Sequence, residues 1–166
     1  MALKRVVVTG LGALTPIGNN LNDFWTGLIE GKSGAAPITY FDTEKFKTKF
    51  ACELKDFDVS LHLDRKQQRK MDRFTQYGMV STEEAIQDSG LDLEKIDKLR
   101  VGVIWGSGIG GIETFQNQML DHASGDGTPR FNQFFIPKMI ADITPGYISM
   151  NYGFMGPNYT TVSACA

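Results

Sequence analysis

Cysteine and histidine are scarce in this sequence, which has two residues of each among 166. Cys52 and Cys165 lie far apart and form neither a C-x-x-C pair nor a metal-ligand spacing, so we expect no metal site. Both cysteines should remain thiols in a reducing compartment. His62 and His122 stand alone in polar surroundings, which favours solvated surface positions.

Long apolar runs are also missing. No stretch approaches the roughly 20 apolar residues that a membrane-spanning helix needs. The N-terminus, "MALKRVVVTG", lacks the apolar region and the cleavage site of a signal peptide. A net charge of −2 argues against general nucleic-acid binding. We therefore expect one soluble, cytoplasmic domain that binds neither membranes nor nucleic acid.

Short runs rich in β-branched and aromatic residues recur along the chain and are typical of strands. "RVVVTGLG" at residues 5–12 predicts a buried strand, and "RVGVIWG" at 100–106 predicts another that runs into a glycine-rich turn. "FKTKFACEL" at 46–54 predicts a strand with Cys52 as a small core residue. "NYTTVSA" at 158–164 is the last predicted strand.

Amphipathic stretches separate these runs, and capping residues mark their ends. Asn22 is expected to begin a helix that Gly31 and Gly34 end. Asp64 and Gln67 resemble a capping box, which predicts one long helix from Asp64 to Gly90. The later predicted helices run from Ile112 to Gly125, from a start at Pro137, and from a start at Thr144-Pro145 to Gly153.

The resulting order alternates strands and helices, which predicts an α/β fold with a mostly parallel sheet. Small residues on the long helix, Gly78, Ser81 and Ala85, indicate that a neighbouring element packs closely against it. Active sites in such sheets form at the carboxyl ends of the strands. Cys165 follows the last strand at that edge, so the local pattern leaves it either a buried thiol or a nucleophile.

Two glycine-rich turns raise the question of a dinucleotide site. "GSGIGG" has Gly106, Gly108 and Gly111 in a G-x-G-x-x-G spacing, and "TGLGALTPIG" precedes Glu30 at the distance of a ribose-binding acid. Glycines are also common wherever a strand turns tightly into a helix. No tyrosine has the lysine four residues later that a short-chain dehydrogenase needs. The dinucleotide interpretation is therefore the weaker one.

A run of cations lies at the start of the long predicted helix. At i, i+4 spacing, one side of this helix would carry Arg65, Lys66, Arg69, Lys70 and Arg73. Exposed cations near a helix N-terminus oppose its dipole, at a cost of about 0.3–1 kcal/mol each. The run is either a solvated face or a docking surface for an acidic partner, and composition alone does not separate the two.

Several segments together resemble the β-ketoacyl-acyl-carrier-protein synthases, and within them the type II elongation synthases of bacterial fatty-acid synthesis. They are "KRVVVTGLGALTPIGN", "DRKQQRKMDRFTQYG", "GVIWGSGIGG", "QFFIPKMIAD" and "GPNYTTVSACA". The resemblance implies a thiolase-like fold, in which two α/β halves form an αβαβα sandwich. Residues 1–166 would supply an incomplete N-terminal half, with the C-terminal half absent.

The resemblance also implies a chemistry, a decarboxylative Claisen condensation. Cys165 falls at the position of the nucleophile, which accepts an acyl chain before malonyl-acyl carrier protein is condensed with it. Ile109 matches a residue of the acyl pocket, and Phe135 and Ile136 match residues that reach the neighbouring subunit's pocket in a homodimer. No cofactor or metal is implied.

The same resemblance favours docking for the cations, because Lys66, Arg69 and Lys70 match the positions that meet acyl carrier protein. Ser163 and Ala166 depart from the threonines that many members have. The family's catalytic histidines and lysine lie beyond the nucleophile, and His62 and His122 do not match them, so we expect this chain alone to be inactive. A thiolase acting on coenzyme A thioesters and a non-catalytic scaffold remain as alternatives.

Overall fold

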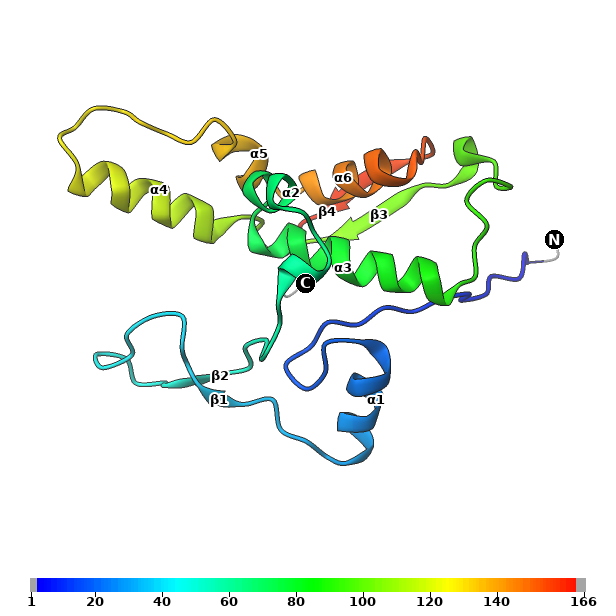
Figure 1. Ribbon diagram of the computed structural model, residues 1–166, viewed down its shortest axis with the longest axis horizontal. Helices are drawn as coiled ribbons and strands as arrows, with labels where there is room; N and C mark the ends of the chain where they lie inside the picture. The colour runs from blue at the N-terminus through cyan, green and yellow to red at the C-terminus, as the bar shows by residue number, and fades with distance from the viewer. Residues whose placement is uncertain (1–2, 164–166) are drawn as a thin grey trace. The chain divides into compact units, whose positions relative to one another are not determined.

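The computed structural model describes residues 3–163 (Figure 1). They form two compact units. The first unit comprises the described residues up to 58 together with 81–91, and the second comprises 59–80 together with 92 onward. Helix α3 (Arg73–Asp88) contributes to both, and all the described candidate site residues belong to the second unit.

The second unit contains a parallel pair of strands. Strands β3 (Val103–Gly106) and β4 (Asn158–Thr161) pair in parallel, with Trp105 beside Thr160, so the predicted parallel pairing is confirmed. Helix α6 (Ile143–Tyr152) contacts both strands (Figure 1). The strands present Ile104 and Tyr159 to solvent, at 66% and 50% exposure.

Helix α3 packs tightly in this unit through a glycine. A Cβ at Gly78 would lie 2.7 Å from the Thr144 methyl carbon and 2.8 Å from the Trp105 ring, closer than side chains pack. Next to this contact, the hydroxyls of Thr75 and Thr144 hydrogen-bond at 3.0 Å in the fully buried core. The close approach predicted from the small residues of this helix is confirmed.

The predicted capping box at Asp64 is confirmed. The Asp64 carboxylate accepts the backbone N–H groups of Lys66 and Gln67, and the Gln67 side chain accepts the N–H of Asp64. These bonds satisfy donors that a helix N-terminus would otherwise leave unpaired.

The prediction of one uninterrupted helix after Asp64 is wrong. Helix α2 (Arg65–Lys70) ends at Met71, whose backbone is extended, and α3 begins at Arg73. Met71 and Asp72 are both buried, and the Asp72 carboxylate accepts the N–H of Phe74 at 3.3 Å. Aspartate favours caps over helix interiors because its side chain competes for backbone N–H groups, so a new helix begins here.

The remaining helices of the second unit are close to their predicted positions. Helix α4 (Ile112–Ser124) ends at Gly125, and α6 ends at Gly153 in the left-handed conformation (φ 71°), both as predicted. Pro145 is the third residue of α6, and Pro137 is the third of α5 (Phe135–Met139). Proline is tolerated there because the N–H groups of a first helical turn have no intrahelical acceptor. Short 3-10 helices are η1 (Val59–Leu61) and η2 (Lys98–Arg100).

In the first unit, helix α1 (Leu21–Ile29) begins after Asn20, whose side chain accepts the N–H of Asp23 at 2.9 Å. The predicted cap at Asn22 is wrong, because Asn20 has the extended backbone that an N-cap requires and Asn22 lies inside the helix. The predicted end at Gly31 is confirmed by its left-handed conformation (φ 66°).

The predicted strand around Cys52 is much shorter than expected. Strands β1 (Ala36–Pro37) and β2 (Phe50–Ala51) form an antiparallel ladder of two residues each. Cys52 is exposed, so its prediction as a core residue is wrong. The ladder lies at the surface of its unit, where Phe50 is itself 64% exposed.

Residues 5–12 do not form the predicted buried strand. Among residues 3–163 they pair with no other strand, and Val6 is 92% exposed. The segment instead packs on the second half of α3, where a Cβ at Gly12 would overlap the carbonyl oxygen of Ser81. The N–H of Leu11 donates to the Asp88 carboxylate at 2.9 Å. A strand needs a partner for its ladder, and here the Asp88 side chain of α3 accepts a backbone N–H instead.

Across the described range, no helix is long and apolar enough to cross a lipid bilayer.

Candidate functional site

Helix α2 presents a cationic face, which we define as Arg65, Lys66, Arg69 and Lys70. All four side chains are exposed, and no carboxylate within residues 3–163 lies within 4.0 Å of them. The opposite side of the helix turns inward, where the Gln68 amide donates to the Leu63 carbonyl at 2.6 Å. The helix is anchored on its opposite side, and its cationic face is accessible to an acidic partner.

Arg73 does not belong to this face. It lies in α3 and its guanidinium donates to the Glu113 carboxylate at 3.0 Å. The predicted opposition to the helix dipole is also wrong for Arg69 and Lys70, which occupy the last turn of α2. Cations at a helix C-terminus are stabilising, so the early end of α2 makes these charges favourable.

The glycine-rich turn at 106–111 joins β3 to α4, and its glycines differ in their surroundings. The N–H of Gly111 donates to the Met139 carbonyl at 2.9 Å, and a Cβ at Gly111 would overlap the Lys138 carbonyl oxygen. Gly110 has a φ of +96°, which favours glycine. Close packing on residues 138–141, rather than a bound dinucleotide, accounts for these two positions.

Of the three predicted pocket residues, one lies on this turn and two lie in α5, whose end the turn contacts. Ile109 is at its open side and is 69% exposed. Phe135, in α5, stacks on Phe131 and Phe115 with ring centroids 5.5 and 6.3 Å apart, and Ile136 is 55% exposed. The residues after Ile109, Gly110 and Gly111, pack on residues 138–141 at the end of α5, the helix that carries Phe135 and Ile136.

The end of β4 meets the start of the same turn. The N–H of Ser107 donates to the Thr161 carbonyl at 3.0 Å, so the carboxyl ends of β3 and β4 lie side by side. Cys165 lies outside the described residues, and its role as nucleophile stays a prediction. Active sites of parallel sheets form at this edge.

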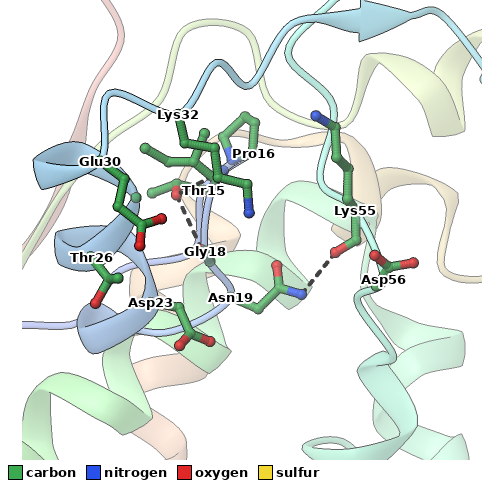
Figure 2. A pocket seen from close by; sticks show the side chains of 12 residues that line it. Thr15, Pro16, Gly18, Asn19, Asp23, Thr26, Glu30, Lys32, Lys55 and Asp56 are labelled. Carbon is green, nitrogen blue, oxygen red and sulfur yellow. Dashed lines mark hydrogen bonds between the residues drawn. The ribbon is translucent and has the colours of Figure 1, made fainter.

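A separate cavity of about 300 Å³ lies in the first unit (Figure 2). Its lining includes the acidic Asp23, Glu30 and Asp56 and the basic Lys32 and Lys55. The wall is held by hydrogen bonds, one of them from the Asn19 amide to the Lys55 carbonyl at 2.8 Å. The cavity contains none of the described residues predicted for the site.

The glycine-rich turn "TGLGALTPIG" at residues 9–18 is packed against a helix and does not form a nucleotide site. Gly10 and Gly12 face the α3 backbone, where a Cβ would overlap the carbonyl oxygens of Ala85 and Ser81. Because α3 occupies the space beside these glycines, a pyrophosphate cannot bind there. Without a pyrophosphate site, Glu30 has no role as a ribose-binding acid.

Neither histidine belongs to the predicted site. His62 and His122 are exposed, as predicted, and the ring of His122 lies 5.5 Å from that of Phe131. Residues 3–163 contain no group of three or more histidine, cysteine, aspartate or glutamate side chains that could hold a metal ion.

Comparison with known proteins identifies the family. Residues 3–166 match the family described as "Beta-ketoacyl synthase, N-terminal domain". The chain belongs to the β-ketoacyl synthase family. It is 45% identical over 166 residues to the "3-oxoacyl-[acyl-carrier-protein] synthase 2" of Staphylococcus aureus (strain COL) and to that of Synechocystis sp.. Each match covers 98% of this chain and 39% of the relative, so the chain spans well under half of their length.

Solved β-ketoacyl synthase structures share the fold. The ishigamide ketosynthase/chain length factor superposes with a TM-score of 0.89 at 28% identity, covering 99% of this chain and 41% of that one. A type II PKS ketosynthase in complex with its acyl-carrier protein superposes with a TM-score of 0.75 at 28% identity, covering 96% of this chain and 41% of that one. The predicted α/β, thiolase-like fold class is confirmed.

Sequence reasoning missed one pair of residues in this region of the synthase. Asp72 and Thr114 are both buried and hydrogen-bonded to each other although 42 residues separate them. An aspartate in the middle of an apolar helical pattern is the signal that could have indicated a helix break. Nothing local could have indicated Thr114 as its partner.

Proposed function

We propose that residues 3–166 form the N-terminal part of the catalytic domain of a β-ketoacyl-acyl-carrier-protein synthase of fatty-acid elongation. The observation that carries this proposal is the 45% identity over 166 residues to relatives named 3-oxoacyl-[acyl-carrier-protein] synthase 2. The chain covers 39% of those relatives, so the active enzyme would be a longer polypeptide. A cytoplasmic location and a homodimer belong to the same proposal.

In the proposed reaction, the Cys165 thiolate attacks the carbonyl carbon of an acyl chain held as a thioester on acyl carrier protein. The carbon–sulfur bond to the carrier breaks, the carrier leaves as a thiol after taking a proton, and the acyl chain stays on Cys165. Malonyl-acyl carrier protein then loses CO₂, and the resulting carbanion attacks the acyl carbon and expels the Cys165 thiolate. The product, a 3-oxoacyl thioester, is longer by two carbons.

An assay of the full-length polypeptide tests this proposal. The enzyme is incubated with an acyl-acyl carrier protein and malonyl-acyl carrier protein, and the 3-oxoacyl product and CO₂ are measured. We expect both to form in equal amounts. Absence of the product with carrier-bound substrates, or condensation of acetyl-coenzyme A alone, would contradict the proposal and favour a thiolase.

Docking of the carrier protein is the part of the proposal that the described residues support most directly. The cationic face of α2 is exposed and has no ion-pairing partner among residues 3–163. Acidic partners are attracted to such a face, and complementary charge mainly accelerates their association. We assign Lys66, Arg69 and Lys70 as the carrier-protein contacts.

Charge reversal should weaken carrier binding. For each of Lys66→Glu, Arg69→Glu and Lys70→Glu in the full-length enzyme, we expect a loss of about 1 kcal/mol, or roughly fivefold in Kd. The loss should shrink as salt is raised, because exposed charges are screened. Kd is measured by fluorescence anisotropy with a labelled carrier protein. Lys47→Glu, which reverses an exposed lysine of the first unit, is the control, and an equal loss there would refute the docking assignment.

The acyl chain is proposed to pass Ile109, with Phe135 and Ile136 contributing to the pocket of the neighbouring subunit. Ile109→Phe adds a ring at the open side of the turn, where the wild-type side chain is 69% exposed and folding should be unaffected. We expect kcat/KM for the longest accepted chains to fall about tenfold, with short chains unaffected. Ile112→Phe, at a residue 54% exposed, is the matched control. A wild-type chain-length profile in Ile109→Phe would remove this residue from the pocket.

A further inference from the structure

Asp72 is a buried carboxylate that has no cationic partner among the described residues. Its exposure is 6%, and no lysine, arginine or histidine within residues 3–163 forms an ion pair with it. The neighbouring Arg73 binds Glu113 instead. Burying a charge is strongly unfavourable unless hydrogen bonds compensate it, so the partners of this carboxylate indicate its role.

Those partners are the first turns of two helices. One carboxylate oxygen accepts the N–H of Phe74 in α3 at 3.3 Å. The other accepts the N–H of Thr114 in α4 at 3.0 Å and also the Thr114 hydroxyl. Helix α4 has no side-chain cap of its own, because its N-cap residue is Gly111. Asp72, the residue just before α3, therefore supplies the acceptor that α4 lacks, and both helix dipoles favour its negative charge.

This double cap fixes one end of the glycine-rich turn. Thr114 is the third residue of α4, which follows the turn directly. The last two residues of the turn, Gly110 and Gly111, also pack against residues 138–141. At Gly108, in contrast, a Cβ would meet no heavy atom of residues 3–163 within 4 Å, apart from its chain neighbours. Ile109 thus follows Gly108, which has open space around it, and precedes Gly110 and Gly111, which lead into the helix that Asp72 caps.

We propose that Asp72 is a positioning residue for acyl-chain selectivity. By capping α4 it holds the turn that carries Ile109 at a fixed distance from the start of α3. Asp72 follows Lys70, the last residue of α2, by only two positions, and its printed side-chain bonds go to α3 and α4. The role in selectivity rests on the proposed function, whereas the role in holding the turn does not.

Two variants of the partner residue test this proposal in the full-length synthase. Thr114→Val keeps the shape of the side chain and the backbone N–H bond to Asp72 but removes the hydroxyl bond, which leaves the cap with one of its two bonds to α4, and Thr114→Ser keeps both. Acylation of the enzyme is measured with short and long acyl chains on the carrier protein. A misplacement of about 1 Å can change a rate by about a hundredfold, so we expect the long-to-short ratio of kcat/KM to change by about tenfold in Thr114→Val. Thr114→Ser should keep the wild-type ratio, and both should bind the unacylated carrier as the wild type does.

An equal loss for all chain lengths in Thr114→Val would overturn the proposal, because it would indicate a purely structural role. Amide hydrogen exchange of residues 107–114 provides a second measurement that needs no activity. We expect faster exchange there in Thr114→Val than in the wild type and Thr114→Ser. Unchanged exchange would overturn the positioning role. Failure of the wild-type enzyme to accept any acyl chain, with exchange changed as expected, would instead count against the proposed function and the selectivity built on it.

Discussion

Replacing Cys165 by serine is expected to abolish acylation of the enzyme, with a fall in rate of at least about a thousandfold. A thiolate attacks a thioester efficiently, and a cysteine thiol has an appreciable thiolate fraction near neutral pH. A serine hydroxyl has no comparable ionised fraction at neutral pH. Intact-mass measurement after incubation of the full-length enzyme with an acyl-acyl carrier protein checks the result, because each acylated molecule gains the mass of the acyl group.

The other cysteine of the chain is the matched control. Cys52 is exposed and lies directly after β2 in the first unit, so Cys52→Ser should leave both folding and acylation intact. If Cys165→Ser still gained the acyl mass, or if Cys52→Ser lost it, the assignment of the nucleophile would be wrong.

Helix ends were the part of the fold that sequence predicted best, because capping is local. The Asp64 capping box, the end of α4 at Gly125 and the left-handed Gly153 each depend on residues within a few positions of one another. The error at α1 was also local, since Asn20 and Asn22 are both capable caps. Asn20 is the cap because its backbone is extended, as an N-cap requires, whereas Asn22 lies within the helix.

Strands were predicted less well, because a ladder depends on a distant partner. The β3–β4 pair forms as expected, joining residues that the whole of α4, α5 and α6 separates. Residues 5–12 have similar composition and form no ladder within residues 3–163. Strand propensity measures how well a residue fits a pleated, half-buried surface, and it does not say which surface is available.

In the candidate site, too, local features could be predicted from the sequence and contacts between distant residues could not. The cationic face could be predicted because charge is visible in the sequence, although the break after Lys70 changed its relation to the helix dipole. The bond from Thr114 to Asp72 could not be predicted, because it links residues 42 positions apart. The glycine spacing of "GSGIGG" was ambiguous for a similar reason: residues 138–141, which require Gly110 and Gly111, lie far along the chain.

Gly111→Ala should be the most destabilising of the substitutions considered for this turn. The added Cβ would overlap the Lys138 carbonyl oxygen, a backbone atom that cannot rotate away. Either residues 138–141 move or the hydrogen bond from the Gly111 N–H to the Met139 carbonyl is lost. Overpacking together with a broken buried hydrogen bond costs about 2–4 kcal/mol, and we expect a loss of that size in the free energy of unfolding, measured by urea titration with circular dichroism.

Gly108→Ala separates this explanation from the dinucleotide interpretation. Among residues 3–163 a Cβ at Gly108 has open space around it, so the free energy of unfolding should change by less than about 1 kcal/mol. If a bound pyrophosphate were the reason for the glycines, Gly108 and Gly111 would both be dispensable for stability, and both substitutions would reduce binding of a dinucleotide. A large loss of stability confined to Gly111→Ala would instead mean that this turn is shaped by the end of α5, which also determines where Ile109 lies.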